Sequence, residues 1–391
     1  MKLNFIALAF AILTGIFSAV RAQEATNVDN LSTPAPAAPP ARVSIVFVQC
    51  HGLGYGDLSC YGQKLFQTPN LDQLASEGVR CEKYFAGNIG STPSPGVLMF
   101  GKNSAPTNGE VTVARRLQQV GYRTGLIGEW GLVAEPWKQG FDEFCGFLDD
   151  DQGRNYFAER IRRFIPHGFI TESNTLIDYN DWLTIFDNAG GKKGRYLPDI
   201  LISAACTWIN DNYADQFNRH RPFFLLVNLP VPRSAHAGKD EFTVTSDAPF
   251  SEEKWPPAAK NRAALIARLD AGIGRIAAQL SAIHLTNDVL FIVSSAAPPE
   301  TFANTNLNFL LPNGNVTSGK DRGAAPLPFI ARWTGTIPAL QTNTLNISAA
   351  DFMPTALELS GQKIPKDLVG HSLLSAFTGA KTEQKTAEIP H

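Results

Sequence analysis

Cysteine is scarce in this 391-residue sequence, and the five cysteines follow no metal-binding or disulfide pattern. They are Cys50, Cys60, Cys81, Cys145 and Cys206. No two of them form a Cys-x-x-Cys pair, which argues against the common zinc sites. Their odd number argues against a complete disulfide framework. Export would permit disulfides, but we expect most of these cysteines to be buried free thiols.

An excess of basic residues is also missing. The chain has 34 Lys and Arg residues against 36 Asp and Glu residues, a formal net charge of −2. Without residues 1–22, which contain Lys2, Arg21 and no acidic residue, the balance is 32 against 36. Proteins that bind nucleic acid present a basic face to its phosphates. The composition therefore predicts no nucleic-acid partner.

Long apolar runs are confined to the N-terminus. Residues 5–20 are mainly apolar, follow Lys2 and precede the small residue Ala22. This pattern is typical of a secretory signal peptide with cleavage after Ala22, and the run is short of the length that spans a bilayer. We therefore expect an exported protein, periplasmic or secreted, with no membrane anchor once residues 1–22 are removed.

The remaining chain divides into a linker, one domain and a tail. Residues 23–41 are rich in Ala and Pro, as in disordered or polyproline linkers. Residues 42–380 form the expected domain, and residues 381–391 follow as a short tail. With 44% hydrophobic residues, a chain of this length can bury a sizeable core.

Strand-like and helix-like segments alternate within residues 42–380, which is the order of an α/β fold. Helical spacing of apolar residues predicts helices over residues 70–78, 111–120, 197–212, 258–280 and 349–359. Apolar runs rich in β-branched and aromatic residues predict strands over residues 43–48, 123–127, 223–229, 289–294 and 327–333. Two polar tracts rich in Asn and Gly, residues 171–193 and 300–323, are typical of loops.

The first predicted strand leads into a loop that has the position of an active site. Residues 43–48 carry no acidic or basic residue and no Pro, which suits a strand buried on both faces. The chain then passes through His51 and Gly52 into a loop that runs from Gly54 to Asp57. In open α/β sheets, ligands bind in the loops at the carboxyl ends of the strands. We therefore expect the site at this loop.

A series of sequence blocks supports a more specific interpretation. The blocks are Gly54–Gly62, Thr68–Gly78, Gly121–Gly128, Gln139–Asp142, Arg221–Leu225, Pro328–Ile330 and Pro354–Gly361. In this order and spacing they resemble the sulfatase family, within the alkaline-phosphatase-like superfamily. The resemblance implies a three-layer α/β sandwich around a central, mostly parallel mixed sheet. The family's small C-terminal subdomain would follow residues 370–374, and we expect it to be absent because the sequence ends at His391.

The resemblance implies a calcium site whose ligands are replaced in this chain. Family members hold the ion with an Asp pair after the first strand and an Asp-Asn pair after a later strand. The matching positions here are His51, Gly52, Ala296 and Ala297. Calcium takes several oxygen ligands, and an imidazole alone does not make a calcium site. We therefore expect no metal and no other cofactor.

The nucleophile position is also degenerate. Family members convert a Cys or Ser to formylglycine within a Cys/Ser-x-Pro-x-Arg motif, which Ser91, Pro93 and Pro95 match in part. Pro95 replaces the Arg that is needed for modification and for orienting the nucleophile, and proline has neither a charge nor a donor. We therefore expect Ser91 to remain an unmodified serine that caps a loop.

The groups that handle the sulfate in the family are replaced as well. Glu129 stands where members have a Lys, and its carboxylate would repel a sulfate ester. Arg233 matches a His that acts as general acid, but an Arg does not release its proton at neutral pH. His236 is the alternative acid. The family's late Lys falls near Thr317, with Lys320 close by.

His51, Glu129, Arg233 and Lys102 are the candidate binding residues of this degenerate pocket. In the family, positions 129 and 233 point into one pocket, and an unpaired buried charge there would cost several kcal/mol. Glu129 and Arg233 are therefore expected either to pair with each other, with His51 sharing the network, or to stay solvated.

Intact scaffold blocks with a replaced site indicate a pseudoenzyme of the sulfatase type. We interpret the chain as an exported protein that has lost sulfuric ester hydrolase activity and acts in binding or scaffolding, with a sulfated glycan or a protein as partner. One alternative is an active hydrolase of the superfamily with a divergent site built on Ser91 or another nucleophile. Another is a serine hydrolase built from Ser94, His51 and Asp57, although no Gly-x-Ser-x-Gly elbow supports it. Bound metal and turnover would distinguish these alternatives.

Overall fold

The computed structural model describes most of the chain beyond the expected linker. The described residues are 43–87, 95–102, 109–149, 156–170, 176–214, 221–234, 242–299 and 326–379. The expected signal peptide, linker and C-terminal tail lie outside these residues, as does the polar tract of residues 300–323.

The order of the elements is that of an α/β protein. The strands are β1 (Ser44–His51), β2 (Val79–Phe85), β3 (Arg123–Glu129), β4 (Glu143–Phe147), β5 (Arg160–Ile170), β6 (Leu176–Thr184), β7 (Phe223–Pro232), β8 (Val289–Ala297), β9 (Leu327–Arg332) and β10 (Gln341–Ser348). The α-helices are α1 (Pro69–Ser76), α2 (Pro95–Phe100), α3 (Val113–Gln119), α5 (Leu197–Ala214), α6 (Pro257–Ala282), α7 (Phe352–Leu359) and α8 (Leu374–Thr378). Each predicted strand and helix coincides with one of these elements.

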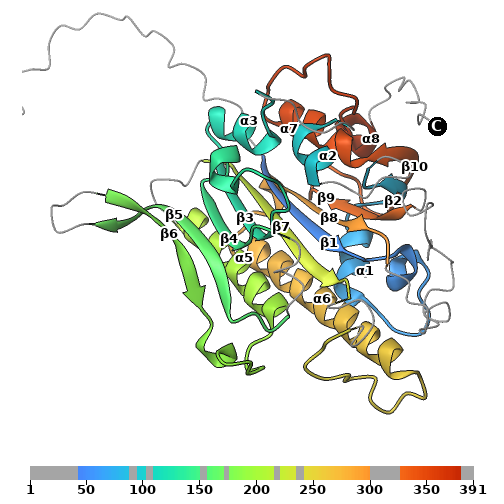
Figure 1. Cartoon of the computed structure of the whole chain (residues 1–391). Coiled ribbons are helices and arrows are strands. Elements are labelled where there is room, and N and C mark those ends of the chain that lie inside the picture. The colour runs from blue at the N-terminus through green and yellow to red at the C-terminus, as the bar shows by residue number, and fades with distance from the viewer. Residues whose placement is uncertain are drawn as a thin grey trace, which may run out of the picture. The chain divides into compact units, whose positions relative to one another are not determined.

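The described strands form one ten-stranded sheet, in the order β10-β2-β9-β8-β1-β7-β3-β4-β5-β6 (Figure 1). The central strands β8, β1, β7, β3 and β4 are parallel to one another. Antiparallel pairs lie outside them, at β8–β9, β9–β2, β4–β5 and β5–β6. All residues of β1 are buried, as expected for a strand covered on both faces. The mixed sheet with a parallel centre is confirmed.

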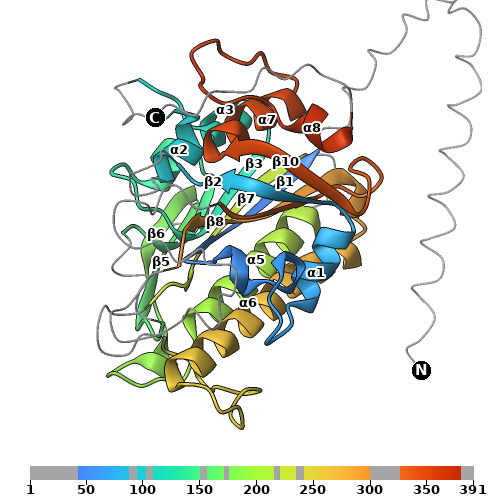
Figure 2. The ribbon, with the colours of Figure 1, turned by 90° about the vertical axis from the view of Figure 1, so that its right-hand side faces the viewer.

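Helices cover both faces of the sheet and make three layers (Figure 2). Helices α1, α5 and α6 pack on one face, and α2, α3, α7 and α8 pack on the other. Strand β1 supplies both cores with alternate residues, because successive side chains of a strand point to opposite faces. Val46 and Val48 belong to the first core, whereas Ile45 and Phe47 belong to the second. Phe47 meets Phe352 of α7 edge to face, with ring centroids 4.9 Å apart.

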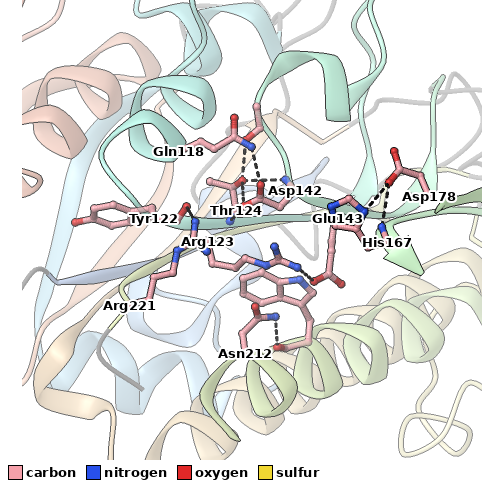
Figure 3. Close-up of polar contacts among 12 residues, drawn as sticks. Gln118, Tyr122, Arg123, Thr124, Asp142, Glu143, His167, Asp178, Asn212 and Arg221 are labelled. Carbon is pink, nitrogen blue, oxygen red and sulfur yellow. Dashed lines mark hydrogen bonds and ion pairs between the residues drawn. The ribbon is translucent and has the colours of Figure 1, made fainter. Parts of the chain in front are cut away.

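Polar contacts join the amino ends of β3 and β4, at the edge opposite their carboxyl ends (Figure 3). The Asp142 carboxylate accepts from the Thr124 backbone N–H at 2.9 Å and from the Gln118 amide at 2.6 Å. Arg123 donates to Glu143 Oε1 at 2.8 Å. Two of the blocks that carry the family resemblance, those with Thr124 and Asp142, thus serve the scaffold.

One predicted loop is a strand. The tract of residues 171–193 contains β6, which pairs with β5 and forms one edge of the sheet. Exposed polar side chains such as Asp178 and Asn180 alternate along it with less exposed ones. Edge strands commonly carry such residues, which oppose pairing with other chains, and this gives β6 the composition of a loop. The prediction of a loop at this position was wrong.

The cysteines do not form disulfides. All five are free, and Cys50, Cys81 and Cys145 are buried. Burial raises the pKa of the Cys145 thiol to about 11, so that this thiol stays protonated at neutral pH. The expectation that most cysteines are buried thiols is confirmed. Within the described part of the chain, no helix has both the length and the apolar character needed to cross a bilayer.

Candidate functional site

The parallel strands bring three of the candidate residues to one edge of the sheet. Since β8, β1, β7 and β3 run in the same direction, their carboxyl ends lie along the same edge. His51, at the end of β1, pairs in register with Ala297 of β8 and with Pro232 of β7. Glu129 is the last residue of β3, and Arg233 follows β7 directly. We call this edge, with His51, Glu129 and Arg233, the carboxyl-edge site.

The three side chains form a buried polar network. Arg233 Nη2 donates to Glu129 Oε1 at 2.6 Å, and Arg233 Nη1 lies 3.2 Å from His51 Nδ1. Glu129 is 1% exposed, Arg233 5% and His51 9%. Away from water the attraction between the two charges is weakly screened, and each charge has its counter-ion. Of the two arrangements that the sequence allowed, the direct pair is the one observed.

The contact with Arg233 fixes where the imidazole proton of His51 lies. A guanidinium has several N–H donors and no acceptor. His51 Nδ1 must therefore accept from Arg233 Nη1, and the ring proton is on Nε2. The Nδ1 lone pair is thus already used inside the protein.

A second buried ion pair holds the loop that follows β1. Arg262 of α6 contacts the Asp57 carboxylate through Nη2 at 2.5 Å and through Nε at 3.1 Å. Arg262 also donates to the Gly52 carbonyl at 3.0 Å, and the Gly54 N–H donates to Asp57 Oδ2 at 2.7 Å. Both charged side chains are fully buried. The loop from Gly52 to Asp57 is therefore fixed to α6.

Three residues at this site were missed in the sequence, and Arg262 is one of them. Ser295 Oγ donates to the Ala297 carbonyl at 2.7 Å and accepts from the Leu53 N–H at 3.2 Å. The Tyr156 hydroxyl donates to the Arg233 carbonyl. A hydroxyl residue beside a predicted strand end, as at Ser295, was an available signal, but most such residues serve no site.

The residues at the carboxyl-edge site do not fit a calcium ion. Gly52, Ala296 and Ala297 offer no ligand side chain, and His51 Nδ1 is occupied by Arg233. Among the described residues there is no group of three or more His, Cys, Asp or Glu side chains that could hold a metal. The Arg233 guanidinium also places a positive charge beside His51, which opposes a divalent cation.

The backbone at Gly52 packs closely against the backbone of Arg233. Gly52 has a φ of +84°, in the region that favours glycine. A Cβ atom at this position would lie 3.3 Å from both the Arg233 backbone N and its Cα. An acidic side chain could not return to position 52 unless this backbone moved.

The other candidate residues lie elsewhere or outside the described residues. Lys102, near the end of α2, pairs with Glu110 and Asp367, each at 2.8 Å, in a separate ion-pair cluster. Its place in a binding pocket stays a prediction. Outside the described residues lie Ser91, Ser94, His236, Thr317 and Lys320.

No activated nucleophile is found among the described residues of the site. The Asp57 carboxylate is held by Arg262 and by the Gly54 N–H, and it does not contact His51. The geometry therefore does not support the serine-hydrolase alternative, in which Asp57 would orient His51. Burial raises the pKa of the Cys50 thiol far above its ordinary value, so Cys50, beside His51, is not a thiolate.

These observations define an α/β protein whose candidate site lies at the carboxyl ends of the central parallel strands and contains a buried ion pair. Residues 44–362 match the sulfatase family, and the chain belongs to this family.

Individual relatives agree with this assignment. Human arylsulfatase A is 28% identical over 375 residues, which cover 85% of this chain and 66% of that protein. The N-acetylgalactosamine-6-O-sulfatase of Bacteroides thetaiotaomicron is 26% identical over 404 residues, which cover 83% of this chain and 74% of that protein. A protein solved in complex with its substrate D-glucosamine-2-N,6-O-disulfate has the same fold, with a TM-score of 0.63, 19% identity and coverage of 86% of this chain and 80% of that chain.

Proposed function

We propose that this chain is an exported, non-hydrolytic member of the sulfatase family that binds a sulfated glycan. The observation that carries the proposal is the buried pair of Glu129 and Arg233 with His51 at the carboxyl-edge site. By resemblance to the family, these three positions would hold the metal and handle the sulfate. Here their side chains contact one another instead.

The network lacks the groups that ester hydrolysis by the family route needs. Arg233 does not act as an acid at neutral pH, and the Glu129 carboxylate would repel a sulfate ester. A ligand set that does not fit calcium also forgoes Lewis-acid stabilisation of the transition state, which is worth several kcal/mol. These features support loss of turnover together with retention of the fold.

The relatives support a glycan as the ligand. One relative is named for a sulfate ester of N-acetylgalactosamine, and one structural neighbour was solved with a disulfated glucosamine as its substrate. Function resides in the site and not in the fold, so a family member that has lost its chemistry can still bind a sugar.

Metal analysis of the purified mature protein, run beside an aryl-sulfate turnover assay, tests the loss of activity. We expect no stoichiometric calcium or magnesium and no turnover above background. An active calcium-dependent sulfatase serves as the positive control. One tightly bound divalent ion per chain, or turnover that depends on it, would instead favour an active hydrolase with a divergent site.

Peptide mass spectrometry tests the nucleophile position. Ser91 should be found as serine, because Pro95 replaces the Arg of the modification motif. Formylglycine is lighter than serine by two hydrogens, so the two are readily separated. Detection of the aldehyde at Ser91 would reopen the case for catalysis.

N-terminal sequencing tests export. The exported protein should begin at Gln23, directly after the expected cleavage site. A product that keeps residues 1–22 and stays in the cytoplasm would contradict this part of the proposal.

A further inference from the structure

Four exposed basic residues lie at the same edge of the sheet as the carboxyl-edge site, and we call them the basic strip: Arg160, Lys192, Lys193 and Arg195. Arg160 is the first residue of β5, and the other three belong to the loop between β6 and α5 (Figure 1). β5 runs antiparallel to β4, so its first residues lie beside the carboxyl end of β4. The basic strip therefore lies at the same edge of the sheet as the site.

The basic strip is a local concentration of positive charge in a chain of formal net charge −2. Residues 156–163 and 184–196 together contain six basic residues and two acidic residues, Glu159 and Asp187. Within the described part of the chain, no carboxylate forms an ion pair with any of the four cations of the strip. All four side chains are exposed.

Aromatic rings orient two of these cations. The Arg160 guanidinium carbon lies 4.6 Å from the Trp182 ring centroid, and the Lys193 ammonium lies 5.7 Å from the Phe157 ring centroid. A cation over an aromatic face is held in place without being neutralised. Both charges therefore keep their attraction for anions.

The loop of the basic strip is held by a buried amide. Asn188 is fully buried, and its Nδ2 donates to the carbonyls of Ala158 and Arg195, each at 2.9 Å. Its Oδ1 accepts from the Arg195 N–H at 2.8 Å. The Gly191 N–H donates to the Glu159 carboxylate at 2.8 Å. A loop ordered before binding loses less conformational entropy when a ligand arrives.

A short segment connects the basic strip with the site. Phe157, which lies under Lys193, follows Tyr156, whose hydroxyl donates to the Arg233 carbonyl. The Tyr156 carbonyl in turn accepts from the Leu197 N–H at 2.8 Å, at the start of α5. The same residue thus contacts the site and the end of the strip's loop.

We propose that the basic strip binds the sulfate groups of a glycan chain that extends outward from the carboxyl-edge site. This inference rests on the proposed function, since it takes the glycan class from it. Sulfate groups stay ionised and recur along such a chain, and exposed cations on an ordered loop complement them. The strip would bind sulfate groups along the chain at this edge of the sheet.

Binding of a size-defined heparin oligosaccharide to the mature protein, measured by calorimetry at two salt concentrations, tests the inference. The variant Lys192→Ser/Lys193→Ser should bind about tenfold more weakly, because two cations near the anionic chain are lost. Its affinity should also depend less on salt. The matched control, Lys363→Ser/Lys366→Ser, removes two exposed lysines after α7 and should keep the wild-type affinity.

The outcomes separate the basic strip from the proposed function. Equal affinity of the two double variants for heparin would contradict binding at the basic strip. The proposed glycan-binding function would be unaffected. Absence of heparin binding by the wild-type protein would overturn the glycan-binding function itself. Chemically desulfated heparin should bind far more weakly than heparin. If desulfated heparin bound as tightly as heparin, the assignment to sulfate groups would be wrong. Tighter binding of anionic lipid vesicles or of single-stranded DNA than of heparin would also overturn it.

Discussion

Arg233 determines the arrangement of the side chains around it. Its guanidinium contacts Glu129 and His51, and its backbone N and Cα lie 3.3 Å from where a Cβ at position 52 would be. A buried guanidinium is tolerated only with a partner. Glu129, Gly52 and Arg233 therefore form a mutually dependent set, and a change at one position alone leaves the others strained or unpaired.

This dependence can be measured with a double-mutant cycle. Glu129→Gln and Arg233→Met should each lower the free energy of unfolding by about 3 kcal/mol, because each leaves a buried charge without its partner. The double variant should lose less than either single variant, so the coupling energy should be about 3 kcal/mol or more. Urea denaturation of the four proteins provides the values.

An exposed ion pair is the control for this cycle. Lys138 and Glu135 lie 3.1 Å apart with side chains 66% and 38% exposed, and exposed pairs contribute little. The same cycle at these positions should give a coupling near zero. Additive effects at positions 129 and 233 would mean that those two side chains do not interact, and the site would then be an open, solvated pocket.

At the scale of elements, a carboxylate joins α1 to α6. The Asp270 carboxylate on α6 accepts from the Leu71 N–H at 2.8 Å, from the Asn70 N–H at 3.2 Å and from the Asn70 side-chain amide at 2.7 Å. The first N–H groups of a helix have no partner within the helix. Asp270 thus caps α1 from another helix. Desolvation by burial nevertheless raises the pKa of the Asp270 carboxyl, because it outweighs the lowering of the pKa by these hydrogen bonds.

Asp270→Ala should lower the free energy of unfolding by about 1–2 kcal/mol, the usual effect of losing a helix cap. Asp211→Ala, at an exposed position on α5, is the control and should have no effect. Because the folded-state pKa of Asp270 is raised, protonation favours the folded state. The difference between wild type and Asp270→Ala should therefore widen as the pH falls from 7 toward 4. A difference that narrows with acidification would contradict the direction of this pKa shift.

The strands that the sequence predicts are buried along nearly their whole length. β1, β7 and β8 are almost wholly buried, and their apolar runs are therefore visible in the sequence. In β10 only Asn343 and Ile347 are buried, and β6 lies at the other edge of the sheet. Most residues of these two strands face solvent, so neither strand shows the regular spacing of apolar residues that predicts a strand.

The sequence predicted where the candidate site lies, but only some of the residues that form it. The motif positions placed His51, Glu129 and Arg233 at strand ends, and the need to pair buried charges indicated their contact. Arg262 was not predictable, since it lies 205 residues from Asp57 in the chain. Within the sequence it is one more Arg in an amphipathic helix, and only the folded chain shows that it is buried.

For the whole molecule, contacts that need no metal hold both ends of the parallel strands. Asp142 joins β3 and β4 at the amino ends, and Arg262 anchors the loop after β1 at the carboxyl ends. The stability of the fold should therefore not depend on a bound ion.

Thermal unfolding in calcium and in chelator tests this independence. A ligand that binds only the folded state at a thousandfold excess over its Kd adds about 4 kcal/mol of stability. We expect the Tm to be the same in millimolar calcium and in EDTA, as measured by scanning calorimetry. A calcium-dependent sulfatase should show a clear difference in the same experiment, and a rise of several degrees here would refute the loss of the metal site.

The pair of Arg262 and Asp57 also bears on how mutations can accumulate in this chain. Most substitutions are removed by selection only when they take a protein below the stability that it needs. Substitutions at positions 296 and 297 alter the chemistry of the edge while the loop keeps its anchor on α6, so selection for folding alone tolerates them. A substitution at Asp57 or Arg262 leaves a fully buried charge without its partner. Different residues thus determine turnover and folding. Catalytic activity can be lost by genetic drift while selection preserves the fold.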